Sequence, residues 1–142
     1  MRVAITGANG FLGSYLVKKC LSSGFQVLAL VRKGANCDTL PTDNTQLSIH
    51  TVKYSDKLTD QLKSLKSNEG SVEYIIHNAG LTVSLDKEEY FRVNTKLTKE
   101  LLTSISESNL LSAKGKFIYI SSYAAHGPKG IEKPVSYYGE SK

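Results

Sequence analysis

Apolar residues gather along the chain in short runs separated by stretches of helical spacing, which is the pattern of strands that alternate with helices. Five runs have the length of strands: Val3 to Thr6, Phe25 to Val31, Ile49 to Lys53, Val72 to His77 and Phe117 to Ile120. The second run is almost entirely apolar, as expected for a parallel strand buried on both faces. This alternation predicts an α/β fold, a doubly wound parallel sheet between two layers of helices, with strand order 3-2-1-4-5.

Three stretches between the strands place apolar residues on one face of a helix. The first helix is expected to stop at Gly24, because glycine adopts a left-handed C-terminal conformation without strain. Asp56 is a candidate N-cap for the second, and Asp86 with Glu89 predicts a capping box for the third. The residues from Ser136 onward predict the first turn of a further helix. The packed faces are Leu12, Leu16, Val17, Cys20 and Leu21, then Leu58, Leu62 and Leu65, then Val93, Leu97, Leu101, Leu102 and Ile105.

The composition narrows the class of protein. With 142 residues, 40% of them hydrophobic and 22% charged, the chain fits one globular domain. No apolar run is long enough to span a membrane and no signal peptide precedes the first strand, so we expect a cytoplasmic protein with no membrane partner. Cys20 and Cys37 lack the spacing of a metal site and are expected to be reduced, and we predict no metal.

The net charge of +5 arises from basic residues spread along the chain and not gathered into a stripe. Such a distribution is typical of solvated helix faces, and we expect no nucleic-acid partner. A basic domain nevertheless favours a phosphorylated small-molecule ligand.

A glycine-rich turn lies between the first strand and the first helix. The turn reads Thr6-Gly7-Ala8-Asn9-Gly10-Phe11-Leu12-Gly13, so glycine recurs at every third position. A strand-to-helix turn of this kind directs backbone N–H groups and the positive end of the helix towards a phosphate. Gly7 permits the turn, Gly10 lets a pyrophosphate approach the main chain, and Gly13 lets the helix pack closely on the sheet. The sequence therefore predicts a dinucleotide site.

The end of the second strand predicts which dinucleotide binds. An acidic residue at this place would accept hydrogen bonds from the adenosine ribose of NAD. The strand ends instead in Val31-Arg32-Lys33. A guanidinium offers two donors to a 2′-phosphate, and Lys33 adds charge, so we expect NADP in preference to NAD. The alternative is that Arg32 and Lys33 are ordinary surface cations.

A tyrosine and a lysine four residues apart, Tyr138 and Lys142, lie in the predicted last helix. Residues at this spacing share a helix face, so the phenol and the ammonium can point into one site. A nearby ammonium favours the phenolate form, which makes the tyrosine a better proton carrier near neutral pH.

Together, the glycine turn and the Tyr138–Lys142 pair resemble the extended short-chain dehydrogenases/reductases, which include nucleotide-sugar epimerases and dehydratases, dihydroflavonol-type reductases and 3β-hydroxysteroid dehydrogenases. The second strand looks more like the dihydroflavonol-reductase and sugar-epimerase branches. The resemblance implies a Rossmann-like NAD(P)-binding domain and hydride exchange at a carbon bearing a hydroxyl or carbonyl group. It implies that Ser122, with Ser121 as the alternative, orients the substrate oxygen, and that Asn94 supports the lysine.

The same resemblance assigns further contacts to the cofactor. Ser55-Asp56-Lys57 is similar to the family segment whose aspartate contacts the adenine, although serine replaces the usual glycine. His77-Asn78-Ala79-Gly80 resembles the loop that packs against the adenine ring and ribose. Both segments follow the carboxyl ends of predicted parallel strands, where such sheets bind ligands.

The resemblance spans the whole chain, from Arg2 to Lys142, whereas family members continue into a substrate domain. We therefore expect residues 1–142 to form an incomplete NAD(P)-binding domain that binds cofactor without turnover. The substrate, a carbonyl or alcohol compound or a nucleotide sugar, is not specified by the sequence. The fifth strand would be a bare edge or be covered by another chain, which leaves a homo-oligomer open. The other interpretation is a short non-catalytic sensor or scaffold that binds a dinucleotide, although such a protein has no need of the Tyr138–Lys142 pair.

Overall fold

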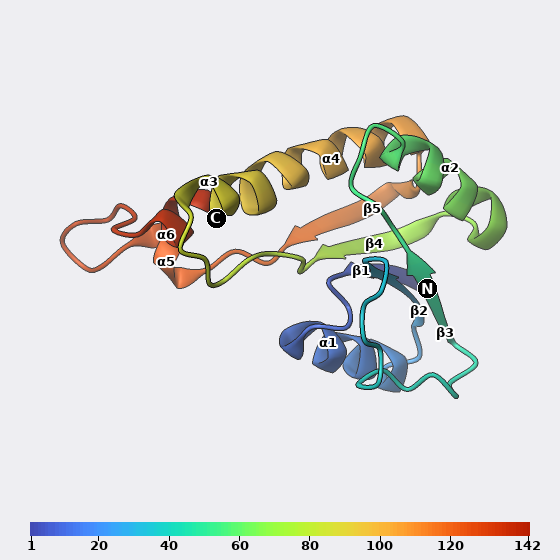
Figure 1. The fold of residues 1–142 in the computed structure, drawn as a ribbon. Helices are drawn as coiled ribbons and strands as arrows, with labels where there is room; N and C mark the ends of the chain where they lie inside the picture. Colours follow the sequence, from blue (N-terminus) through green and yellow to red (C-terminus); the bar gives the residue numbers. More distant parts are fainter.

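The five strands of the computed structural model, which describes residues 1–142, form one parallel sheet (Figure 1). The strands are β1 (Arg2–Thr6), β2 (Gln26–Val31), β3 (Leu47–Thr51), β4 (Val72–His77) and β5 (Leu111–Tyr119). Their order is β3-β2-β1-β4-β5, which confirms the predicted doubly wound topology. The order changes direction between β1 and β4, so the chain leaves these two strands towards opposite faces of the sheet (Figure 1). A sheet of this kind binds ligands in the crevice between such connections.

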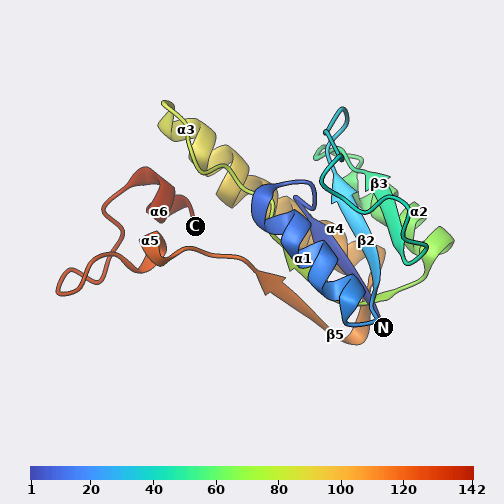
Figure 2. The ribbon, with the colours of Figure 1, turned by 90° about the horizontal axis from the view of Figure 1, so that it is seen from below.

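Helices cover both faces of the sheet, and short helices lie beyond its carboxyl edge. The helices are α1 (Phe11–Ser22), α2 (Leu58–Glu69), α3 (Lys87–Tyr90), the π-helix η1 (Phe91–Lys96), α4 (Leu97–Ser108), α5 (Tyr123–His126) and α6 (Tyr137–Ser141). α1 lies on one face, and α2 and α4 lie on the other (Figures 1 and 2). None of these helices has both the length and the apolar character needed to cross a bilayer.

Each face of the sheet has its own core. The side chains of Val3, Ile5, Val27 and Ala29 point to the α1 face, whereas their neighbours along the strands point to the other face, as the two-residue period of a strand requires. On the α2–α4 side the core consists of Ala4, Leu28, Leu30, Val52, Leu58, Leu62, Leu65, Val72, Ile75, Leu101, Ile105 and Leu110. Cys20 and Cys37 pack against the α1 side and are unpaired.

The two outer strands differ from their predicted bounds. β3 begins at Leu47 and not at Ile49, because its parallel register pairs Leu47 with Val27. β5 begins at Leu111 and not at Phe117, because Leu111 already pairs with Val72 on β4. The register then shifts, and pairing continues from Lys116 onward, while the lysines of the strand stay exposed. An edge strand of this kind needs no apolar run to form. The hydrophobic pattern therefore does not predict where it begins.

The predicted helix ends are confirmed in part. Gly24 has a φ of +80°, in the left-handed region expected after α1. Asp56, however, does not cap α2: the helix has Lys57 at its N-cap without a side-chain hydrogen bond, and the Lys57 N–H donates to Ser55 Oγ at 3.3 Å. The prediction of Asp56 as a cap is therefore wrong, because the Leu58 N–H, which a cap at Asp56 would bind, donates to the Ser55 carbonyl at 2.9 Å. Leu12, expected on the packed face of α1, is exposed.

The long helix after residue 86 departs most from the expectation. Asp86 caps α3 by accepting a hydrogen bond from the Glu88 N–H at 2.9 Å. Glu89 does not complete the capping box, because its carboxylate accepts instead from Ser84 Oγ at 2.8 Å, and Ser84 Oγ also accepts from the Asp86 N–H. The helix then continues as η1 before it becomes α4. A π-helical segment within an α-helix is rare and is frequently associated with functional sites.

The core on the α2–α4 side makes a prediction for stability. Leu62 is 1% exposed in the middle of α2, so Leu62→Ala should lower the free energy of unfolding by about 2–5 kcal/mol, since it leaves a cavity. Leu102→Ala on α4 is the matched control, because Leu102 is 44% exposed and should cost no more than about 0.5 kcal/mol. Urea unfolding followed by circular dichroism measures both changes. Equal losses would show that α2 does not pack on the sheet as described.

Candidate functional site

The glycine turn is built from backbone atoms that approach too closely for side chains. Gly7 has a φ of +63°, and a Cβ built on it would lie 2.8 Å from Ala79 Cα. A Cβ on Gly13 would lie 2.0 Å from the Gly7 carbonyl oxygen. Gly10 differs, because a Cβ there would meet only that same oxygen, at 3.3 Å. Gly7 and Gly13 are therefore required by the packing of the turn, and Gly10 leaves the outer surface of the turn open.

The first turn of α1 leaves its backbone donors available. Gly10 is the N-cap, no side chain caps the helix, and the first turn holds no acidic residue. Unpaired N–H groups at the positive end of a 12-residue helix favour an anion. Phe11 is 85% exposed beside this opening, and its ring meets Tyr15 edge to face. Asn9 is held at the rim, since its Nδ2 donates to the Asn36 carbonyl at 3.1 Å.

The loop after β4 is fastened to the turn by three contacts. Asn78 Nδ2 donates to the Gly7 carbonyl at 3.2 Å, and the Ala79 N–H donates to Thr6 Oγ1 at 3.1 Å. Thr6 Oγ1 also lies 2.7 Å from His77 Nδ1. The predicted segment from residue 77 to 80 is thus brought against the glycine turn, with His77 buried and Gly80 exposed.

The residues predicted to select the cofactor lie at the ends of β2 and β3. Arg32 and Lys33 are exposed, and neither forms an ion pair. Burial raises the pKa of the Tyr54 phenol, and a hydrogen bond with Thr6 and the charge of Arg32 oppose this shift. Asp56 and Lys57 are exposed and form no hydrogen bond with the glycine turn.

The helix α6 carries Tyr138 and leads into Lys142. It begins at Tyr137 after Ser136, whose side chain accepts from the Gly139 N–H at 3.1 Å. This confirms the predicted helical turn. A Cβ on Gly139 would lie 2.3 Å from the Ala124 carbonyl oxygen, so α6 packs directly on α5 only because this position is glycine. The sequence analysis missed Gly139, although a glycine inside a predicted first turn is a signal for close packing.

Asn94 connects η1 to this helix. Its Nδ2 donates to Ser141 Oγ at 2.9 Å and to the Leu81 carbonyl at 2.9 Å, and its Oδ1 accepts from the Leu81 N–H at 2.7 Å. Thr95 Oγ1 donates to the Ser141 carbonyl at 3.0 Å. The buried carboxamide therefore joins η1, the loop after β4 and α6.

The Lys142 ammonium lies in a half-buried position. Its Nζ is 4.8 Å from the centre of the Tyr119 ring, and a Cβ on Gly80 would be 3.3 Å from it. Burial lowers the pKa of Lys142. Burial raises the pKa of the Tyr119 phenol, and the charge of Tyr138 adds to this effect. Tyr119 at the end of β5 was not foreseen, because nothing in the local pattern separates it from other strand residues.

The two serines after β5 both have local partners. Ser122 Oγ accepts from the Ala124 N–H at 3.2 Å as the N-cap of α5. Ser121 Oγ donates to the Lys142 carbonyl at 3.4 Å. The cap uses the hydroxyl oxygen of Ser122 as an acceptor, and a hydroxyl in this role still has its proton to donate.

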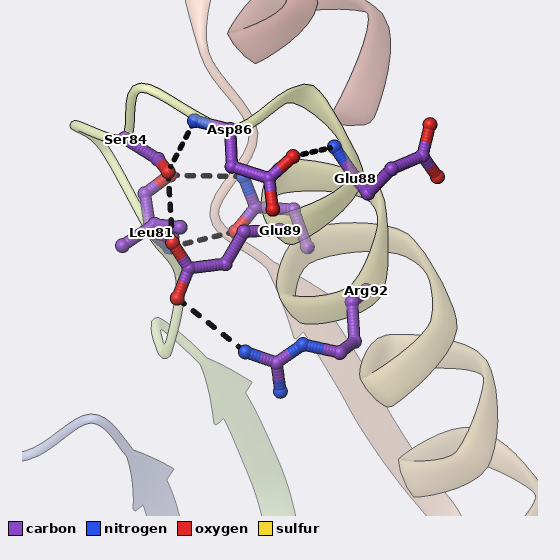
Figure 3. A network of polar contacts seen from close by, with 7 residues as sticks. Leu81, Ser84, Asp86, Glu88, Glu89 and Arg92 are labelled. Carbon is purple, nitrogen blue, oxygen red and sulfur yellow. Dashed lines mark hydrogen bonds and ion pairs between the residues drawn. The ribbon is translucent and has the colours of Figure 1, made fainter.

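A polar network fixes the loop beside α6. Ser84 lies between the Asp86 N–H and the Glu89 carboxylate, and Arg92 approaches Glu89 at 3.4 Å (Figure 3). The Ser84 N–H donates to Tyr90 Oη at 2.9 Å, and the Tyr90 ring lies 6.1 Å from the Tyr138 ring. An open hollow on the surface of α3 and η1 is separate from the glycine turn, and its lining residues are Asp86, Glu88, Glu89, Phe91, Arg92 and Lys96.

Several known proteins are similar in sequence to this chain. The curated relatives include a fatty acid hydroxylase of Mycosarcoma maydis, 27% identical, and a putative dihydroflavonol 4-reductase of a Synechocystis strain, 28% identical. These matches cover 89% and 97% of the chain but 41% of each relative, so the chain spans about two fifths of their length.

A solved structure shows the same fold. The Bordetella bronchiseptica enzyme WbmG in complex with NAD superimposes with a TM-score of 0.78 over 100% of this chain and 46% of that one, at 21% identity. The sequence profile of the NAD dependent epimerase/dehydratase family matches residues 3–142. The chain belongs to the NAD dependent epimerase/dehydratase family.

Proposed function

We propose that this chain is the cofactor-binding and proton-transfer part of an NAD(P)-dependent oxidoreductase, epimerase or dehydratase that acts on a carbon bearing a hydroxyl or carbonyl group. The observation that carries the proposal is the position of the Lys142 ammonium, against Gly80 and the Tyr119 ring, with Tyr138 one helical turn before it. Gly80 belongs to the loop that is fastened to the glycine turn. The tyrosine–lysine pair and the dinucleotide site therefore share one edge of the sheet.

The residues of the glycine turn fit a dinucleotide. The open surface above Gly10 and the uncapped first turn of α1 offer a pyrophosphate both space and N–H donors. Phe11 and Leu12 are exposed beside this surface, and Asn78, Ala79 and Gly80 flank it. These residues would hold the cofactor, together with the cations at the end of β2.

When bound, the nicotinamide supplies the hydride exchange. Tyr138 carries the proton to or from the substrate oxygen, with the positive charge of the Lys142 ammonium one helical turn after it. Lys142 provides that charge from a half-buried position, where it is less screened than in water. Ser122 donates its hydroxyl proton to the same oxygen, and Asn94 holds the end of the helix in place through Ser141.

NADP is the cofactor that the end of β2 favours. Arg32 and Lys33 are exposed cations without an acidic partner, in the place where a carboxylate would select NAD.

Replacement of Arg32 tests this preference. The chain should bind NADPH more tightly than NADH, and Arg32→Ala should weaken NADPH binding by about 10- to 100-fold through loss of a charge-assisted pair. Calorimetric titration with both cofactors measures the change. Lys63→Ala, an exposed cation on α2, is the control and should leave both affinities unchanged. Equal affinities for the two cofactors in the unaltered chain would contradict the preference for NADP.

Tyr138→Phe tests the proton carrier in the whole enzyme. The variant keeps the ring that packs near Tyr90 but lacks the hydroxyl, so turnover should fall by about 10²- to 10⁴-fold while cofactor affinity stays within about twofold. Tyr137→Phe is the matched control, since Tyr137 is the neighbouring exposed tyrosine of the same helix. Near-normal activity of Tyr138→Phe at neutral pH would remove Tyr138 from the mechanism.

Residues 1–142 by themselves should bind the cofactor without turning over a substrate. The glycine turn and the loop fastened to it are complete within this stretch, whereas the relatives devote more than half of their length to residues that it does not match. The fluorescence of bound NADPH measures binding, and no tryptophan of the chain interferes with it. Assays with a panel of ketones and nucleotide sugars measure turnover. Robust turnover by these residues alone would show that no further part is needed.

A further inference from the structure

Both nitrogens of the buried His77 ring are hydrogen bonded to threonines from different elements. Nδ1 lies 2.7 Å from Thr6 Oγ1 on β1, and Nε2 lies 2.9 Å from Thr98 Oγ1 on α4. His77 is 2% exposed at the end of β4, between the strand that enters the glycine turn and the helix that continues from Asn94. No step of the proposed mechanism uses this ring.

The surrounding hydroxyls determine which nitrogen carries the proton. Thr98 Oγ1 donates its only proton to the Asn94 carbonyl at 2.6 Å, so it must accept from His77 and Nε2 must be protonated. Thr6 Oγ1 already accepts from the Ala79 N–H at 3.1 Å, and its own proton is free to go to Nδ1. A neutral imidazole with the proton on Nε2 satisfies every one of these contacts. Burial, and then the charge of Lys142, lower the pKa of His77 to about 4, which agrees with a neutral ring.

The contacts of His77 reach the C-terminal end of the Tyr138–Lys142 helix by two routes. Through Thr98 the ring fixes the Asn94 carbonyl, and the Asn94 side chain binds Ser141. Through its face the ring stacks on Tyr119, with 5.8 Å between centroids and 24° between planes. Lys142 Nζ lies over that same Tyr119 ring.

We propose that His77 is a positioning residue that couples the cofactor-binding strand β1 to the Tyr138–Lys142 helix, as a neutral imidazole that donates to Thr98 and accepts from Thr6. It holds Asn94 through hydrogen bonds and Lys142 through the Tyr119 ring. The functional meaning of this coupling rests on the proposed function, in which Tyr138 and Lys142 act on the substrate. The coupling itself is a property of the chain that is measurable without cofactor.

Thr98→Val separates this role from simple space filling. Valine keeps the shape of threonine but removes both the acceptor for Nε2–H and the donor to the Asn94 carbonyl. The control is Thr59→Val on α2, because Thr59 Oγ1 also makes two hydrogen bonds, to Ser104 and Glu107, away from the Tyr138–Lys142 helix. Thr98→Ser retains the hydroxyl and should restore the behaviour of the unaltered chain.

Nitrogen-15 NMR of residues 1–142 provides the measurements. In the unaltered chain we expect the Nε2–H tautomer at neutral pH. In Thr98→Val the hydrogen exchange of the Asn94 side-chain amide should accelerate by about tenfold, since one of the buried bonds that hold its helix is gone. The pKa of Lys142 should rise towards its ordinary value as the ammonium becomes less buried.

Three results would overturn the proposal. The first is a His77 ring that carries its proton on Nδ1 in the unaltered chain, and this result would overturn the proposal even if no variant folds. If Thr98→Val and Thr59→Val gave the same Asn94 exchange rate and the same Lys142 pKa, His77 would only fill space. Failure of Thr98→Ser to restore both quantities would have the same meaning. Titration with NADPH is run on the same samples: absence of binding by the unaltered chain would contradict the proposed function alone, because the NMR measurements do not depend on cofactor.

Discussion

The close approach of the backbone between Gly7 and Gly13 is the constraint on which the rest of the structure depends. No Cβ fits at either position, because Gly7 packs on Ala79 and Gly13 packs on the Gly7 carbonyl. This contact sets where α1 begins and directs its free N–H groups to the edge of the sheet. It also leaves the loop after β4 so near that Asn78 binds the turn directly. Everything that meets the cofactor or Lys142 is placed relative to this contact.

The sequence was sufficient for the architecture and for the position of the turn, and insufficient for contacts between distant segments. Strand order follows from alternating apolar runs and right-handed crossovers, rules that need only local pattern. The beginning of β5 could not be found in this way, because an edge strand is defined by backbone pairing with β4. Tyr119 was missed for the same reason: its importance arises from Lys142 above its ring, a contact between residues that are not close in sequence.

The predicted site residues divide into those that the fold brings together and those that it leaves apart. Asn94, Gly80 and Lys142 meet at one place, and the catalytic roles that the resemblance gives to Asn94 and Lys142 stay predictions. Asp56 and Lys57 remain on the surface without a bond to the turn. Asp56 was expected to serve both as cap and as adenine contact, and the loss of the first role leaves the second as a prediction. Local propensity overestimated Asp56 because the Ser55 carbonyl accepts the same backbone donor.

The π-helix η1 determines the rotational phase of the helix that follows it. A π-helical turn contains more residues than an α-helical turn, and one residue of an α-helix corresponds to a rotation of about 100°. Asn94 lies within η1 and faces Ser141, whereas Leu101 and Ile105 lie further along and face the sheet. Asn94 and the two core residues must therefore point in different directions from one continuous helix. The wider π-helical turn makes both directions possible. The segment is consequently intolerant of a change in length: a single-residue deletion would leave its composition almost intact yet turn either the carboxamide or Leu101 and Ile105 away from their partners.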